Sequence, residues 1–181
     1  MRAAGRPNGS SGPGAVRIEP WGEGDLPLLE QLLGDPAMTE YLGGPESTEK
    51  IAERQARYER MTADKGRLFK IVDAATGEPA GWVGYWERTW QDEQVYEIGW
   101  SVLPAFQGRG MAGEATNLAV AAARSDRKHR FIYAFPAVAN VPSNAICRKT
   151  GFTLVEEREF EYPPGTFMQC NVWGLDLLAS S

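Results

Sequence analysis

A glycine-rich segment at residues 107–113 has the composition of a loop that binds an anion. It reads Gln-Gly-Arg-Gly-Met-Ala-Gly and lies between an expected strand and an expected helix. Glycines let backbone N–H groups approach a ligand closely, and a helix N-terminus adds unpaired donors and a partial positive charge. The layout predicts a phosphate or pyrophosphate site, with a plain glycine-rich turn as the alternative. The segment lacks the Gly-Lys-Ser/Thr of a P-loop and does not match the G-x-G-x-x-G pattern of a dinucleotide fold.

The same segment resembles a loop of a known enzyme family. Gln107-x-x-Gly110-x-Ala112 matches the Q/R-x-x-G-x-G/A pyrophosphate loop of the GNAT superfamily of acetyltransferases. Residues 97–104 look like that family's fourth strand, and residues 140–143 with 149–152 resemble its N-x-x-S…K-x-G-F signature. The combination, over residues 15–177, is most similar to the branch of ribosomal-protein N-terminal (alanine/serine) acetyltransferases.

The resemblance implies an N-acetyltransferase that uses acetyl-coenzyme A (acetyl-CoA) as co-substrate. The acetyl group would pass to a primary amine by direct attack in a ternary complex. A non-catalytic acyl-CoA-binding or sensor module is the alternative. The strand end from Trp100 to Val102 would pair with the pantetheine arm as an added strand does. Asn140 would bond a pantetheine amide, a role compatible with capping the helix that follows it. No metal is implied, and the implied coenzyme-binding residues are Trp100, Ser101, Val102, Gln107, Gly108, Arg109, Gly110, Met111, Ala112, Gly113, Asn140 and Ser143.

Two side chains are candidates for the proton transfers of such a reaction. An amine attacks a thioester only in its neutral form, and its usual pKa of about 10 makes a base useful at neutral pH. Glu97 is the candidate base, acting through a water. A glutamate oriented toward solvent or a structural salt bridge is the alternative, and Glu87 and Glu114 are reserves. Many relatives place a tyrosine four residues before the glycine of the G-F pair, where this chain has Cys147. The thiol either gives a proton to the departing thiolate or fills a buried position, while backbone N–H groups near Val102 would stabilise the developing oxyanion.

The pattern of apolar residues and turns predicts the elements that position these side chains. Alternating runs predict strands, and apolar residues at helical spacing between capping signals predict helices. The expected fold is α+β, a mixed and mostly antiparallel central sheet flanked by helices, in the order β-α-α-β-β-β-α-β-α-β-β. The expected elements are a strand at 15–20, helices at 26–34 and 48–63, strands at 68–73, 80–89 and 96–103, a helix at 112–122, a strand at 131–135, a helix at 142–150, and strands at 152–160 and 168–177.

The composition excludes several other classes of protein. The 181 residues carry a net charge of −5, which does not favour a nucleic-acid partner, and no apolar run of about 18 residues indicates a membrane span. Residues 1–14 predict a disordered leader before a single domain at 15–178. Two cysteines without a C-x-x-C pair favour free thiols in a cytoplasmic protein, and His129, among charged residues, is expected to be solvated. Pairing of the last strand into a homodimer is a further expectation.

Three of the six tryptophans indicate an aromatic surface near the candidate base. Trp82, Trp86 and Trp90 share one face of a regular strand, where they either pack in the core or line an acceptor cleft. Glu156, Glu157, Glu159 and Glu161 add negative potential near the penultimate strand. Both features favour a cationic or neutral amine, so the expected acceptor is a peptide or protein N-terminus or a small-molecule amine.

Overall fold

The computed structural model describes residues 15–161 and 164–179, so the expected leader at 1–14 lies outside the described residues. The described residues contain one seven-stranded sheet with the strand order β1-β2-β3-β4-β5-β7-β6. Neighbouring strands are antiparallel except β4 and β5, which are parallel. The strands are β1 (Val16–Pro20), β2 (Gly66–Asp73), β3 (Pro79–Trp90), β4 (Glu93–Val102), β5 (Phe131–Ala134), β6 (Thr153–Glu161) and β7 (Phe167–Asp176).

Four α-helices complete the described chain: α1 (Leu26–Gly34), α2 (Thr48–Glu59), α3 (Met111–Asp126) and α4 (Val141–Lys149). Their order confirms the expected α+β fold. The α2 helix ends at Glu59 instead of residue 63, because the carbonyl of Thr62 closes a turn by accepting from the N–H groups of Lys65 and Gly66. That turn leads the chain directly into β2.

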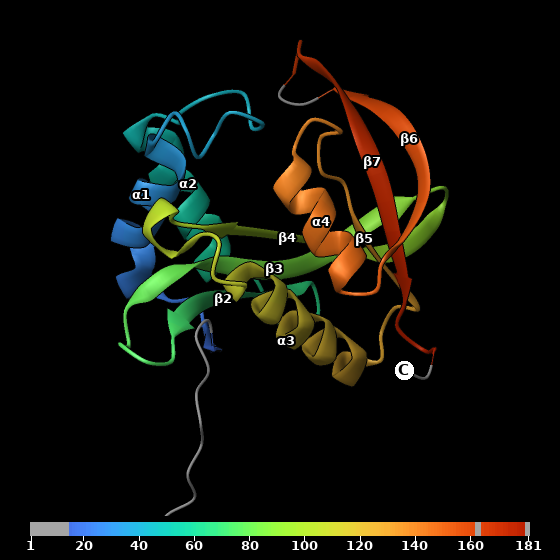
Figure 1. Cartoon of the computed structure of the whole chain (residues 1–181), viewed down its shortest axis with the longest axis horizontal. Coiled ribbons are helices and arrows are strands. Elements are labelled where there is room, and N and C mark those ends of the chain that lie inside the picture. Colours follow the sequence, from blue (N-terminus) through green and yellow to red (C-terminus); the bar gives the residue numbers. More distant parts are fainter. Residues whose placement is uncertain (1–14, 162–163, 180–181) are drawn as a thin grey trace, which may run out of the picture.

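Helices cover both faces of the sheet because side chains alternate along each strand. Val83 and Tyr85 of β3 are buried in the main core together with Ala115 and Ala119 of α3. Trp82, which directly precedes Val83 and so lies on the opposite face, has its ring centroid 6.3 Å from that of Tyr58 in α2. In Figure 1, α1 and α2 lie together near one end of β3 and β4, and the β6–β7 hairpin lies near the other.

Strands β4 and β5 run together over a short distance and then separate. Their register contains only the pairs Tyr96–Ile132 and Glu97–Tyr133. Beyond Glu97, β4 continues to Val102 beside β3, whereas β5 ends at Ala134 beside β7. Within the described residues, the stretch of β4 after Glu97 therefore has no strand partner on its β5 side. The sheet is open there to an added strand-like ligand.

The position of β7 bears on the expected homodimer. This last strand lies between β5 and β6, pairing with β6 along most of its length and with β5 from Trp173 to Asp176. The strands at the two edges of the sheet are β1 and β6. The last strand is therefore an inner strand of the sheet, and a homodimer stays a prediction without an assigned surface.

His129 corrects an expectation, because its side chain is only 9% exposed. Its Nε2 lies 2.9 Å from Glu87 Oε1, and its ring packs edge-on against the buried ring of Tyr96 at a centroid distance of 4.6 Å. An aromatic surface and a carboxylate thus remove from water a side chain that its charged sequence neighbours had indicated as solvated. Among the described helices, none is long and apolar enough to cross a membrane.

Candidate functional site

The glycine-rich loop between β4 and α3 presents backbone donors to open space. Gly108 and Gly110 have φ angles of +73° and +80°, in the left-handed region that favours glycine. Gly110 caps α3 without a side chain, and the first bond back to it comes from the N–H of Glu114. Within the described residues, the N–H groups of residues 108–113 have no hydrogen-bond acceptor. A Cβ atom built on Gly108, Gly110 or Gly113 would meet no atom within 4 Å, so an anion has room beside these donors.

An ion pair fixes this loop to the end of β2. The Nη2 atom of Arg109 lies 2.7 Å from Oδ2 of Asp73, whose side chain is 2% exposed. The N–H of Ala75 and the Arg109 guanidinium hold the pKa of Asp73 below its usual value. Gln107 uses its side-chain amide to donate to the carbonyl of Val102 at 2.9 Å. Arg109 and Gln107 therefore connect the loop to two strands before any ligand arrives.

Glu97 lies at the last register pair before β4 and β5 separate. Its Oε2 accepts from Nη1 of Arg88 at 2.7 Å, and the carboxylate remains 23% exposed. The salt bridge that was the alternative to a base role is thus present, but within the described residues it occupies only one carboxylate oxygen. Oε1 is left for a water or an amine.

The two reserve glutamates are placed less well for proton transfer. Glu87 lies on β3, where Lys128, Lys65 and His129 hold its carboxylate and lower its pKa to about 2. Such a carboxylate is a poor base at neutral pH. Glu114 lies exposed in the first turn of α3.

Two tryptophans form an aromatic floor beside Glu97. Trp86 pairs across the strands with Glu97, and Trp82 pairs with Ser101, so all four share one face. The two indole rings lie 6.3 Å apart, and a Cβ on Gly99 would come within 3.1 Å of the Trp86 ring and 3.2 Å of the Trp82 ring. The indoles therefore cover the backbone at Gly99.

The third tryptophan of that face belongs to the core. Trp90 is buried, with ring centroids 5.0 Å from Phe135 and 5.7 Å from Phe160. The three tryptophans of this strand therefore do not all lie in the same kind of environment. Trp90 packs, and Trp82 and Trp86 are partly exposed beside Glu97.

The N-terminus of α4 is held by a side chain that the sequence did not identify. Oδ1 of Asn140 accepts from the N–H of Ser143 at 3.1 Å, which is the expected cap. Buried Asn144 donates to the carbonyls of Ala137 and Asn140 and accepts from Asn171 and Trp173 of β7, all at 2.8–2.9 Å. All four hydrogen-bonding positions of the Asn144 amide are satisfied. Asn144 thus fixes the backbone at Asn140, whose own amide N–H₂ has no acceptor within the part of the chain that the structure describes.

Cys147 is completely buried in the main core, on α4. Burial raises the pKa of its thiol to about 12. Proton transfer from this thiol to a thiolate with the usual pKa of about 8.5 is energetically uphill. The surroundings therefore favour the packing role over the proton-donor role.

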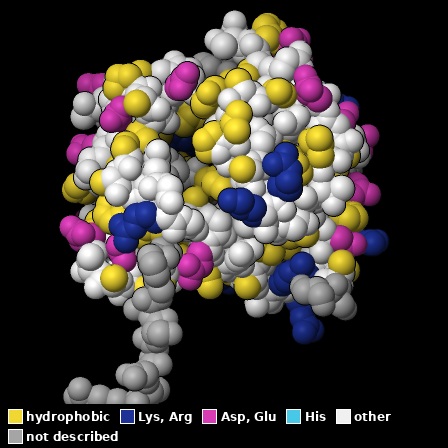
Figure 2. Space-filling view, in the orientation of Figure 1, with side chains coloured by type: hydrophobic (Ala, Val, Ile, Leu, Met, Phe, Trp, Pro, Cys, Tyr) yellow, Lys and Arg dark blue, Asp and Glu magenta, His cyan; other side chains and the backbone are white. Residues whose placement is uncertain are grey.

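The surface is hollowed between the α1–α2 part and the α4 part, with hydrophobic side chains along the rim (Figure 2). The connection between α1 and α2 reaches both sides of this opening, because Met38 Sδ lies 3.6 Å from Nε2 of Gln107 and the Tyr41 hydroxyl donates to the carbonyl of Ala139. Lys and Arg side chains gather over α4, whose last turn carries Arg148 and Lys149.

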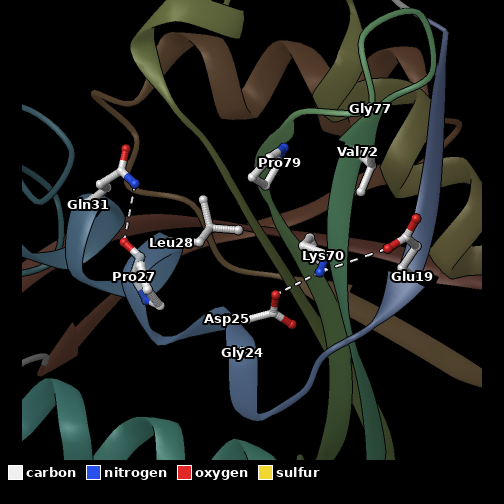
Figure 3. A pocket seen from close by; sticks show the side chains of 10 residues that line it. All are labelled: Glu19, Gly24, Asp25, Pro27, Leu28, Gln31, Lys70, Val72, Gly77 and Pro79. Atoms are coloured by element: carbon white, nitrogen blue, oxygen red, sulfur yellow. Dashed lines mark hydrogen bonds and ion pairs between the residues drawn. The ribbon is translucent and has the colours of Figure 1, made fainter.

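Two other hollows lie away from the glycine-rich loop. One, of about 290 Å³, lies between α1 and β2, where the Lys70 ammonium sits between Asp25 at 2.7 Å and Glu19 at 3.8 Å (Figure 3). The other, of about 650 Å³, lies beside the C-terminal half of α3 and is lined by Asn117, Arg124 and residues of β7. Neither is lined by residues 107–113 or by Glu97.

Comparison with known proteins gives a consistent fold and family. Residues 15–153 match the family described as acetyltransferase (GNAT) domain. No curated protein matches the chain. A GNAT-family acetyltransferase from Bacillus anthracis superposes with a TM-score of 0.75 at 17% identity, over 93% of this chain and 98% of that one.

Two further solved structures were determined with ligands. Spermidine N-acetyltransferase from Vibrio cholerae, in complex with CoA and spermine, gives a TM-score of 0.74 at 18% identity, over 90% of this chain and 95% of that one. An aminoglycoside acetyltransferase in complex with coenzyme A gives 0.71 at 17% identity, over 90% and 95%. At these identities the structures show a shared fold, and the family match covers the loop, Glu97 and all of α4.

Proposed function

Because the chain belongs to the GNAT acetyltransferase family, we propose that its reaction is the transfer of the acetyl group of acetyl-CoA to a primary amine in a ternary complex. One observation carries the proposal. Within the described residues, the N–H groups of residues 108–113 have no acceptor, and shortly before them in the chain the edge of β4 after Glu97 has no strand partner. At the start of that open edge, the carboxylate of Glu97 has one oxygen without a partner. The first feature fits a pyrophosphate, the second fits the amide-bearing pantetheine arm, and the third fits an incoming amine.

The residues that would hold acetyl-CoA come from three segments. The N–H groups of residues 108–113 would bind the pyrophosphate, with Arg109 and Gln107 fixing the loop from behind. The backbone of β4 from Trp100 to Val102 would pair with the pantetheine arm, and the Asn140 amide would bond it from the opposite side. Ser143 lies in the same first turn of α4. When bound, acetyl-CoA supplies an activated thioester.

Glu97 would accept the proton that the amine must lose. Its Oε1 is free within the described residues, while Arg88 fixes the orientation of the carboxylate through Oε2. A positioned carboxylate acting through one water satisfies the geometric requirement for a general base. Backbone N–H groups near Val102 would donate to the carbonyl oxygen that gains charge.

The acceptor class is the finer part of the proposal. The aromatic floor and the net acidic chain support a cationic or neutral primary amine, either a peptide or protein N-terminus or a small-molecule amine. The motif resemblance supports the ribosomal-protein N-terminal branch. The spermidine and aminoglycoside acetyltransferases that share the fold support a small-molecule amine.

The experiment that tests the function is a turnover screen. Thiol release from acetyl-CoA would be followed with peptides bearing free N-termini, polyamines, aminoglycosides and amino acids. Release that depends on an amine supports the acetyltransferase. Tight acetyl-CoA binding without release for any amine would instead support the acyl-CoA-binding or sensor module.

A further inference from the structure

Arg88 combines a charged group with an aromatic setting beside the candidate base. It lies on β3, diagonally across from Glu97, and its guanidinium carbon is 4.2 Å from the ring centroid of Phe135. The rings of Trp90 and Phe160 lie at 5.6 Å from the same carbon. The Arg88 side chain remains 30% exposed. The guanidinium is therefore fixed by three rings and one carboxylate, and it still reaches solvent.

The hydrogen-bond donors of Arg88 are mostly unused. A guanidinium carries five N–H donors, and within the described residues only one of those of Arg88 has an acceptor, Oε2 of Glu97. Arg67, by contrast, makes three hydrogen bonds to Asp126, and Arg130 makes two to Asp176. Free N–H groups on a planar guanidinium match the two oxygens of a carboxylate. Arg88 can thus accept an anionic group without giving up its bond to Glu97.

The charges around Glu97 do not suit an acceptor with several positive charges. Glu97 and Arg88 cancel each other, and the further guanidinium near the Trp90 ring, that of Arg158, is paired with Glu156. A polycation seated at Glu97 would meet the guanidinium of Arg88 and a carboxylate that this guanidinium already neutralises. A molecule that carries one positive and one negative group close together would meet complementary charges at both ends.

We infer that the acceptor is a zwitterion, a free α-amino acid with an apolar side chain. This inference rests on the proposed function. Its amino group would lie at Glu97 Oε1, its carboxylate at Arg88, and its side chain against Trp82 and Trp86. These groups come from adjacent strands and share one face of the sheet.

The reaction at this site balances without any further reagent. The amine nitrogen forms a bond to the acetyl carbon, and the C–S bond breaks with its electron pair going to sulfur. Two protons leave the original ammonium group. One passes through water and Glu97 to solvent, and the other ends on the sulfur, so the products are an N-acetyl amino acid and a free thiol.

Matched acceptors that differ only in the carboxylate test the inference. L-methionine would be compared with L-methioninamide, and L-phenylalanine with L-phenylalaninamide, by kcat/KM from thiol release. The free acid should be preferred by about tenfold to a hundredfold, the range expected for charge-assisted hydrogen bonds to a guanidinium. Equal kcat/KM for acid and amide, or a clear preference for spermidine, would overturn the inference while leaving an amine acetyltransferase intact. If none of the acceptors tested caused thiol release, both the proposed function and the inference would be overturned.

Substitution of Arg88 tests whether this side chain binds the carboxylate of the acceptor. In Arg88→Gln, the KM for the free acid should rise by about tenfold to a hundredfold, the same factor as the preference for the acid over the amide. That preference should fall towards one, and the affinity for acetyl-CoA should be unchanged. The control is Arg158→Gln, which removes a guanidinium near the same Trp90 ring but one that pairs with Glu156; its preference should stay that of the unmodified protein. Arg88→Lys, which keeps the charge, should retain part of the preference. A preference that survives in both Arg88 variants would show that another group binds the carboxylate and would overturn the assignment.

Discussion

Two glycines of the loop proposed to bind the pyrophosphate should respond to alanine with opposite changes in stability and the same change in acetyl-CoA affinity. Gly110 has φ +80°, whereas Gly113 lies within α3 and is not among the residues with positive φ. A methyl group on either glycine meets no atom of the protein within 4 Å. Any loss of acetyl-CoA affinity that both variants share must therefore come from a clash between the added methyl group and the bound coenzyme.

The magnitudes follow from the backbone and from packing. Gly110→Ala puts a side chain on a left-handed residue and should lower the free energy of unfolding by about 1–2 kcal/mol. Gly113→Ala should raise it by about 0.5–1 kcal/mol, because glycine is the poorer helix former. A methyl group forced against a closely bound pyrophosphate costs about 1–3 kcal/mol, which corresponds to a Kd for acetyl-CoA raised about fivefold to a hundredfold. Gly110→Glu adds a charge of the same sign as the pyrophosphate. It should raise the Kd for acetyl-CoA more than tenfold, a loss of roughly 1.4 kcal/mol or more in binding free energy.

Calorimetric titration with acetyl-CoA gives Kd, and denaturant unfolding gives stability. The informative variant is Gly113→Ala, because its affinity should fall while its stability rises. No general damage to the fold produces that combination. An unchanged Kd for Gly113→Ala would show that the coenzyme does not approach the start of α3, and the assignment of residues 108–113 as the pyrophosphate site would then be wrong.

Four further substitutions test the other groups. Glu97→Gln should lower kcat by about 10²–10⁴-fold with acetyl-CoA affinity nearly intact, and the deficit should shrink at high pH; wild-type turnover at neutral pH would place the base elsewhere. Asp73→Asn should raise KM for acetyl-CoA by about tenfold at nearly constant kcat, because Arg109 loses its charged partner, and an unchanged KM would refute that positioning role. Cys147→Ala should keep kcat within about threefold; a loss of about 10²-fold would restore the proton-donor role. Because ionised Glu87 is held by two lysines and His129, the stability that it contributes is complete above pH 4.5 and is lost as the pH falls towards 2. Glu87→Gln should therefore flatten the dependence of unfolding free energy on pH in that range, and a dependence equal to wild type would contradict the assignment.

Local signals in the sequence were sufficient for most of the elements and for the position of the glycine-rich loop between a strand and a helix. Ser47 caps α2 by accepting from the N–H of Lys50, and Asn140 caps α4, as residue type and position indicate. Gly108 and Gly110 adopt left-handed backbone, a conformation for which glycine is the favoured residue. These features depend on contacts within about one helical turn, so the order of residues specifies them directly.

The partners of the charged side chains depended on the tertiary structure. Asp73 and Arg109 meet although 36 positions separate them, and Arg88 reaches Glu97 only through the register of β3 with β4. His129, in the connection between α3 and β5, is removed from water by Glu87 of β3 and Tyr96 of β4.

The order of strands was decided in the same way. The sequence predicted seven strands and their succession, but β7 inserts between β5 and β6, and β4 separates from β5 just after Glu97. Strand neighbours are chosen by the burial of whole faces against α3 and the other helices, and no single segment contains that information. The sequence by itself therefore determined that a glycine-rich loop, a glutamate and a group of tryptophans exist. Only the packed sheet, by bringing distant strands into register, decided that Arg88 stands beside that glutamate and that two of the three tryptophans form the floor.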